Sequence, residues 1–175
     1  MKLTDLFTNT LTIGLTTLTL TTCLWAGEPA AASPQPAATS VPAACQTDCA
    51  SPYGQVLGTA PGNILAYSNC NAKCVIFEPH KEKGTYTGIK WQCVEFARRW
   101  LLNQTGTVYG DVDTAADIWK LNTVIRVATS TPLPFDSYPN GATAVPQVGD
   151  LLIYAKEDLN TGHVAVITRV DKPAG

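Results

Sequence analysis

Apolar side chains recur at intervals of three and four residues in the middle of the chain. Val94, Ala97 and Leu101 would share one face of a helix, as expected for an amphipathic helix that packs on a core. Gly106 follows this run and is a typical C-terminal cap. The pattern therefore predicts a helix that starts near Lys90 and ends near Gly106.

A second helix is indicated after Thr114, where the sequence Thr-Ala-Ala-Asp resembles a capping box. Apolar residues follow it: Ile118, Trp119, Leu121 and Val124. The stretch from 130 to 149 contains several Pro, Asn and Gly residues. Because these residues interrupt helices and strands, we expect a loop there.

Short apolar runs rich in β-branched residues predict strands over residues 150–155 and 163–170. The polar segment between them, 156–162, is expected to form a hairpin-type loop. His163 then lies at the start of its strand, from where an imidazole can lean toward a neighbouring helix terminus. Residues 54–67 mix apolar runs with Gly and Pro, which indicates further extended segments joined by tight turns.

The N-terminal pattern is that of a targeting segment. A lysine at the second position precedes an uncharged, moderately apolar, threonine-rich stretch over residues 11–27, and small residues follow. This is the order found in secretory signals, although Asp5 and the many threonines are atypical of them. The apolar stretch is too short for a convincing membrane span. We expect an export signal over residues 1–27 and a periplasmic or extracellular protein. The alternatives are a lipid anchor at Cys23 and a poorly ordered N-terminal extension.

Residues 28–52 consist mainly of Ala, Pro, Ser, Thr and Gln, with almost no large apolar side chain. Such a segment cannot offset the entropy lost on ordering by burying apolar surface. We expect a flexible linker there, followed by one folded domain over residues 53–175.

The charge of the chain excludes one class of partner. The 12 Lys and Arg residues and the 14 Asp and Glu residues give a formal net charge of −2. The basic residues are scattered, whereas a nucleic-acid-binding surface needs a basic patch. Nucleic acid is therefore not expected as a partner, and the oligomeric state stays open.

The cysteines suggest both a framework and a reactive group. Of the 6 cysteines, one lies in the expected export signal and Cys93 lies in the predicted helix. The other members form two C-x-x-x-C pairs: Cys45, Cys49, Cys70 and Cys74. In an exported protein such pairs suggest disulfide bonds, although the sequence does not choose among the possible pairings. A structural zinc site is the alternative.

Cys93 is the candidate nucleophile. Backbone N–H groups at a helix N-terminus stabilise negative charge, so a thiol placed there is favoured as the reactive thiolate, and the nearby Lys90 would add to this effect. His163 can supply the base that such a nucleophile needs. The hypothesis is a Cys/His amide hydrolase that needs no metal or organic cofactor. The alternative for Cys93 is a buried small apolar residue.

Five segments carry a resemblance to a known family: residues 53–62, 90–99, 139–141, 149–154 and 161–165. They are similar to the CHAP domain, a papain-related family of cysteine, histidine-dependent amidohydrolases and peptidases. Within it they resemble the amidase domain of glutathionylspermidine synthetase/amidase. The resemblance implies an α+β papain-like fold in which N-terminal helices pack on an antiparallel sheet. It also implies that Cys93 is the nucleophile and His163 the general base.

The family uses a third residue, a carboxylate or amide on the strand after the histidine, to orient the imidazole. The nearest acid after His163 is Asp171, in the turn that would lead to that strand. We therefore expect no third triad residue in this chain and a C-terminally truncated domain, with a dyad that works alone as the alternative. Gln92 can donate to an oxyanion beside the backbone N–H of Cys93; a solvated Gln92 is the alternative.

Other side chains receive simpler interpretations. Glu95 and Arg99 lie four residues apart and are expected to form a surface ion pair. Arg98 is a surface residue unless it meets a substrate carboxylate or the third catalytic residue, and His80 lies in a charged loop and should be solvated. Three tryptophans are expected in the core or in a cleft wall: Trp91, Trp100 and Trp119.

These interpretations combine into an exported amidohydrolase that acts through a thioester on Cys93. The resemblance favours a small amide conjugate of the glutathionylspermidine type, whereas export favours peptidoglycan as the substrate. A disulfide-stapled binding module without turnover is the non-enzymatic alternative.

Overall fold

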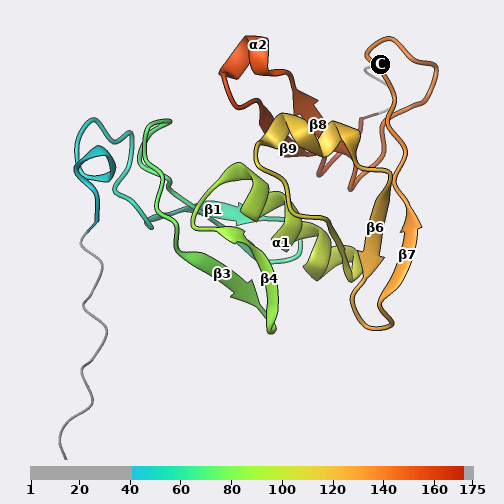
Figure 1. The fold of residues 1–175 in the computed structure, drawn as a ribbon, viewed down its shortest axis with the longest axis horizontal. Coiled ribbons are helices and arrows are strands. Elements are labelled where there is room, and N and C mark those ends of the chain that lie inside the picture. Colours follow the sequence, from blue (N-terminus) through green and yellow to red (C-terminus); the bar gives the residue numbers. More distant parts are fainter. Residues whose placement is uncertain (1–40, 172–175) are drawn as a thin grey trace, which may run out of the picture. The chain divides into compact units, whose positions relative to one another are not determined.

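The computed structural model describes residues 41–171, apart from the side chains of 158 and 159. This part of the chain has a mixed α+β architecture with one main helix and several small antiparallel sheets (Figure 1). In chain order the elements are η1 (Ala43–Cys45), β1 (Val56–Ala60), β2 (Ile64–Tyr67), β3 (Pro79–Glu82), β4 (Thr85–Ile89), α1 (Cys93–Thr105), β5 (Thr107–Tyr109), η2 (Ala115–Lys120), β6 (Thr123–Arg126), β7 (Thr131–Pro134), β8 (Leu151–Tyr154), α2 (Lys156–Leu159) and β9 (His163–Val166). The export signal predicted for 1–27 and the anchor at Cys23 lie outside the described residues.

The predicted central helix is confirmed as α1. It begins at Cys93 rather than near Lys90, because the residues before it form a turn in which the Gln92 N–H donates to the Ile89 carbonyl at 3.1 Å. Gly106 ends the helix in the left-handed conformation, with φ 69°, and its N–H donates to the Leu102 carbonyl at 3.1 Å. Glycine adopts this conformation without steric penalty, which explains its place as the cap.

The core of the described part surrounds α1. Ala97, Trp100 and Leu101 are buried on its inner face. Side chains from the surrounding elements complete this core: Ile64, Tyr109, Ala115, Ile118, Val124 and Val164. β2, β4, β5 and β9 all pack on the helix. The predicted arrangement of helices on one antiparallel sheet is therefore too simple, because one helix is packed by strands of separate small sheets.

The hairpin β3–β4 was not predicted. Lys83 and Gly84 join its strands with positive φ angles of 51° and 81°, as in the two-residue turns that match the twist of a hairpin. Its charged sequence suggests a solvated loop, yet Thr87 on β4 is fully buried against α1. His80 accordingly lies on a strand, which corrects the interpretation of a charged loop.

Two other predictions need correction. The helix predicted after Thr114 is the 3-10 helix η2, which is followed almost at once by strand β6. The loop predicted over 130–149 contains strand β7, which pairs with β6 at the edge of a three-stranded sheet. Pro132 and Pro134 lie on this strand, and proline is tolerated at an edge because one side of the strand needs no N–H donor.

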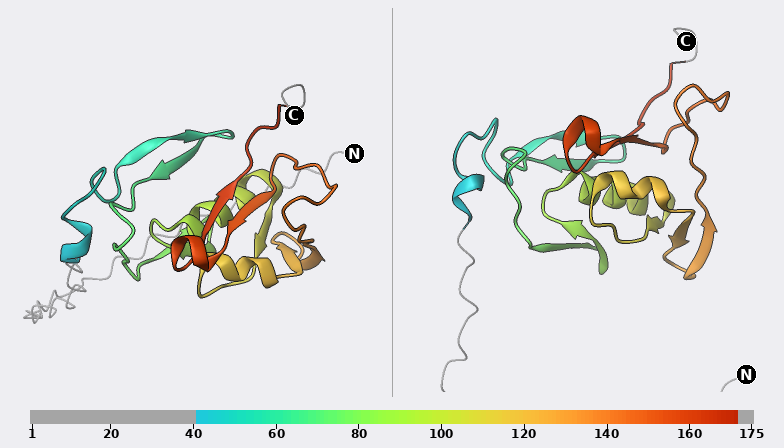
Figure 2. Two further views of the ribbon diagram at one scale, coloured as in Figure 1. Left: turned by 90° about the horizontal axis from the view of Figure 1, so that it is seen from above. Right: turned by 45° about the horizontal axis from the view of Figure 1, so that its top comes forward.

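The two C-terminal strands are confirmed as β8 and β9, which pair antiparallel with Tyr154 opposite His163. β9 ends at Val166, earlier than predicted, and the connection carries the short helix α2 (Figure 2). Gly162 precedes His163 with φ +71°. A Cβ on Gly162 would lie 2.5 Å from the Tyr154 carbonyl oxygen and 2.9 Å from the Ala116 N atom. Only glycine fits this connection without rearrangement.

The four cysteines of the two C-x-x-x-C pairs form two disulfide bonds, Cys45–Cys74 and Cys49–Cys70. They gather in a small buried cluster with Tyr53 and Ile76. The linker predicted for 28–52 therefore extends too far, because residues 41–52 contain η1 and are cross-linked to the fold. No helix between residues 41 and 171 has both the length and the apolar character needed to cross a membrane.

Candidate active site

Cys93 is the first residue of α1, half-buried, and the free cysteine among residues 41–171. The Gln92 carbonyl before it accepts the first helical hydrogen bond, from the Phe96 N–H at 3.1 Å. The N–H groups of the first turn have no acceptor within the helix and point past its end. Cys93 therefore lies at the end of the helix where unpaired backbone N–H groups are available to a negatively charged group.

His163 is the first residue of β9, the strand that packs on α1. Val164, the next residue, is buried in the core around α1, against which Cys93 also packs. The His163 ring lies beside the Tyr154 ring, with centroids 5.7 Å apart. The fold therefore presents Cys93 and His163 from the first residues of two elements that are packed together.

The expectation that this chain has no third triad residue behind His163 stays a prediction. Asp171, the nearest acid after the histidine, accepts a hydrogen bond from Arg169 Nε at 2.8 Å. Among the side chains that the structure describes, which leave out those of 158 and 159, no polar contact joins the His163 ring to another side chain. Asp171 therefore pairs within its own segment.

The side chain of Gln92 makes contacts that the sequence does not indicate. Its Nε2 donates to Asn69 Oδ1 at 3.0 Å and to the Cys74 carbonyl at 3.1 Å. An amide nitrogen carries two hydrogens, and both are used here. Its predicted role as an oxyanion donor requires one of these bonds to open, and that role stays a prediction.

A buried carboxylate lies two residues after the thiol, in the first turn of α1. Glu95 is 1% exposed, and its Oε1 accepts from Arg99 Nε at 2.7 Å and from the Thr87 hydroxyl at 3.1 Å. The same oxygen lies 2.8 Å from His80 Nδ1. The expected surface ion pair is therefore a buried one, and the expected solvated His80 is a half-buried partner of it. The error arose because β3 and β4, which supply His80 and Thr87, were not predicted.

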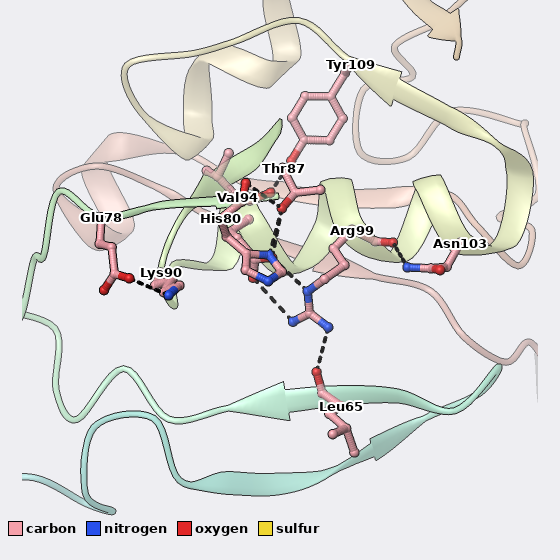
Figure 3. A network of polar contacts seen from close by, with 10 residues as sticks. Leu65, Glu78, His80, Thr87, Lys90, Val94, Arg99, Asn103 and Tyr109 are labelled. Carbon is pink, nitrogen blue, oxygen red and sulfur yellow. Dashed lines mark hydrogen bonds and ion pairs between the residues drawn. The ribbon is translucent and has the colours of Figure 1, made fainter. Parts of the chain in front are cut away.

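Arg99 extends this network to β2. Its Nη1 donates to the Leu65 carbonyl at 2.9 Å (Figure 3). The guanidinium lies within 6 Å of the Tyr67, Trp91 and Phe96 rings, at 5.5, 5.9 and 5.5 Å, where cation–π attraction contributes. Trp91 stacks on Tyr67, so it belongs to this aromatic wall, and Trp100 is buried in the core. Trp119 is 45% exposed, which corrects its assignment to the core or a cleft wall.

Arg98 and Lys90 each have a partner within the fold. Arg98 is 6% exposed, and its Nη1 donates to Asp111 at 3.0 Å, so it is a buried residue rather than a surface one. The Lys90 ammonium pairs with Glu78 (Figure 3). The Lys90 ammonium therefore already has a counter-charge within the fold.

Tyr109 fixes the residue that follows the thiol. Its hydroxyl donates to the Val94 carbonyl at 2.8 Å (Figure 3). The side chain is fully buried, and burial raises the pKa of the phenol well above its ordinary value. The neutral phenol therefore donates to the backbone next to Cys93 at all moderate pH values.

The site residues that the sequence missed are Asn69, His80 and Thr87. A turn signal, Lys83-Gly84 before β-branched and aromatic residues, indicates the hairpin that carries the last two. Nothing local in the sequence marks Asn69. Among the described residues no three His, Cys, Asp or Glu side chains gather in a position to hold a metal ion.

The chain is similar to proteins that are already known. The CHAP domain family matches residues 84–174. Trypanothione synthetase from Crithidia fasciculata is 45% identical over 120 residues, which cover 68% of this chain and 18% of that protein. The bifunctional glutathionylspermidine synthetase/amidase of Escherichia coli (strain K12) is 39% identical over 129 residues, covering 68% of this chain and 21% of that protein. The chain thus spans about a fifth of the length of these relatives.

Proposed function

Because the chain belongs to the CHAP domain family, a family of cysteine-dependent amidohydrolases, we propose that it hydrolyses an amide bond with Cys93 as nucleophile and His163 as general base. The observation that carries this proposal is a free thiol at the first residue of α1, on which the strand headed by His163 packs. The family also supports a papain-like arrangement of the domain.

The proposed reaction is an acyl transfer. His163 takes the proton of the Cys93 thiol, and the sulfur attacks the amide carbonyl. The backbone N–H of Cys93 holds the resulting oxyanion, joined by Gln92 if its side chain is released. His163 then gives the proton to the leaving amine, and water attacks the thioester to release the acid and restore the thiol.

The substrate we favour is a small amide conjugate of the glutathionylspermidine type. The support is the name of the Escherichia coli relative, a bifunctional glutathionylspermidine synthetase/amidase, together with the match of this chain to a fifth of its length. The synthetase activity of that protein is not proposed for this chain.

Peptidoglycan is the second candidate substrate, and the disulfide bonds favour it. Disulfide bonds persist in oxidising compartments outside the cytosol, and the described part holds two of them. They support the proposal that the protein is exported. An exported protein would have access to the amide bonds of peptidoglycan. A disulfide-stapled binding module without turnover remains the non-enzymatic rival.

The first experiment replaces each member of the dyad. Cys93→Ala and His163→Ala should each lower the rate of amide hydrolysis at least about a thousandfold, because each removes a group that takes part in bond making. Release of amine from glutathionylspermidine and of soluble fragments from peptidoglycan would be measured side by side. Unchanged circular dichroism spectra would show that the variants fold. Substantial activity in either variant would exclude the dyad, and an inactive parent on both substrates would favour the binding module.

A further inference from the structure

The turn in front of Cys93 is held by a segment that lies far from it in the sequence. Besides the two bonds from Gln92 to Asn69 and Cys74, the Lys90 N–H donates to the Glu78 carbonyl at 3.0 Å. The long-range hydrogen bonds of this turn are therefore made to residues 69–78, while the Trp91 ring stacks on Tyr67. The direction in which the helix leaves the turn depends on that segment.

The two acceptors that Gln92 uses are themselves firmly placed. Asn69 Nδ2 donates to the Asn71 carbonyl at 3.2 Å and to the Cys74 carbonyl at 3.0 Å. Cys74 is fully buried and is bonded to Cys45. The Asn71 side chain then ties the loop to η1, since its Nδ2 donates to the Ala44 and Thr47 carbonyls, each at 2.9 Å. The acceptors are thus part of the disulfide-linked segment.

Gln92 is the N-cap residue of α1, but its side chain makes no capping bond. Side chains that cap a helix are usually Ser, Thr, Asp or Asn, which reach back to the first turn. The longer Gln side chain reaches away from the helix instead, to Asn69. A residue at this position contributes more to anchoring the turn than to capping the helix.

We propose that Asn69 is a positioning residue that places the Cys93 thiol through Gln92. The disulfide-linked segment is the rigid support from which it acts. The catalytic part of this inference rests on the proposed function, whereas its effect on the thiol does not. A thiol one residue from a loosened turn loses its fixed relation to the helix terminus and to His163.

Alkylation of Cys93 by iodoacetamide isolates this effect from catalysis. The thiolate displaces iodide at a saturated carbon, so no oxyanion forms. A role of Gln92 in holding an oxyanion therefore does not affect the rate of this reaction. Asn69→Leu should lower the second-order rate constant about tenfold, because small displacements of reacting groups have effects of this order. Asn69→Asp keeps an acceptor for Gln92 Nε2 but loses the Nδ2 donor to the Asn71 and Cys74 carbonyls, so its rate constant should lie between those of Asn69→Leu and the parent. Asn103→Leu is the matched control, because Asn103 bonds to the Arg99 carbonyl on the same helix but not to Gln92.

A double-mutant cycle decides whether Asn69 acts through Gln92. Gln92→Met removes both donors without touching the disulfide-linked segment, so it should reproduce the effect even if Asn69→Leu folds poorly. If Asn69 acts through Gln92, the double variant should be no slower than Gln92→Met alone. The proposal would be overturned if the double variant were slowed by the product of the two single effects. It would also be overturned if both single variants were alkylated at the rate of the parent.

Steady-state hydrolysis supplies the second readout. Asn69→Leu should lower kcat about tenfold with little change in KM, because the thiol rather than the substrate loses its placement. If the parent hydrolyses no amide while the alkylation cycle holds, the proposed function fails and the positioning role stands. If the parent is active and Asn69→Leu changes neither the alkylation rate constant nor kcat, the positioning role is wrong while the proposed function stands.

Discussion

At the scale of the residue, Glu95 shows how a charge two residues from a candidate nucleophile is stabilised. Its carboxylate accepts from Arg99 and Thr87 and contacts His80, and it is 1% exposed. Burying these charges gains little net stability compared with an apolar core, but removing one of them leaves its partners without a counter-charge in the interior. The cluster is therefore sensitive to substitution on any side.

Glu95→Gln should lower the free energy of unfolding by about 3 kcal/mol, because the buried Arg99 would lose its counter-charge. Glu157 is exposed, so Glu157→Gln is a control that should change stability by less than about 0.5 kcal/mol. Urea unfolding followed by tryptophan fluorescence measures both. Equal stability of the two variants would contradict the buried ion cluster.

Tyr109→Phe tests the hydrogen bond to the residue after Cys93 and should destabilise by about 1 kcal/mol at neutral pH. Burial raises the pKa of Tyr109 above its ordinary 10.0. The neutral phenol therefore stabilises the fold fully below pH 10, and this contribution is lost as pH rises further and the unfolded chain ionises. The stability gap between parent and variant should shrink, and can reverse, in alkaline solution. Tyr138→Phe, at a 59% exposed position, is the control, and a gap independent of pH would refute the assignment.

At the scale of the element, the connection into β9 sets the place of His163. Gly162 has a positive φ and close neighbours on two elements, whereas Gly84 in the β3–β4 turn has a positive φ of +81° and nothing within 4 Å of an added Cβ. Substitution of Gly84 therefore tests backbone strain alone, whereas substitution of Gly162 tests strain and crowding together. Their comparison shows how tightly the strand that carries His163 is held.

Gly84→Ala should destabilise by about 1 kcal/mol through backbone strain alone. Gly162→Ala should destabilise by about 3 kcal/mol, because the new Cβ also collides with the Tyr154 carbonyl and Ala116. Gly162→Ala should in addition lower kcat, since His163 is the next residue. Thermal unfolding and hydrolysis rates test this, and equal effects of the two substitutions would show that the connection is not crowded.

At the scale of the whole described part, the features that could be predicted are those that depend on short stretches of sequence. The period of α1, its cap at Gly106 and the strands β8 and β9 follow from short stretches of sequence, and all three are confirmed. The disulfide bonds were predicted, although their pairing was not. Strand β7 was not predicted because its two prolines are typical of loops, and proline occurs in strands mainly at the edge of a sheet.

The contacts around Cys93 could not be predicted because they join distant segments. Asn69 meets Gln92 across 23 positions, and His80 meets Glu95 across 15. Periodicity describes one element at a time, so it places a polar residue on a face without naming its partner. Glu95 and Arg99 were recognised as a pair, but their burial depends on a hairpin whose charged sequence resembles a loop.

The central claim is that Cys93 carries the acyl group, and stoichiometric alkylation tests it most directly. Non-reduced protein would be treated with increasing iodoacetamide, and each sample would be divided between peptide mass spectrometry and an amide hydrolysis assay. The free thiol of Cys93 should take up the label, whereas the four disulfide-bonded cysteines should not. Hydrolysis should fall in direct proportion to the labelled fraction of Cys93 and vanish at full labelling. Protein that is fully alkylated at Cys93 yet keeps its activity would contradict the account.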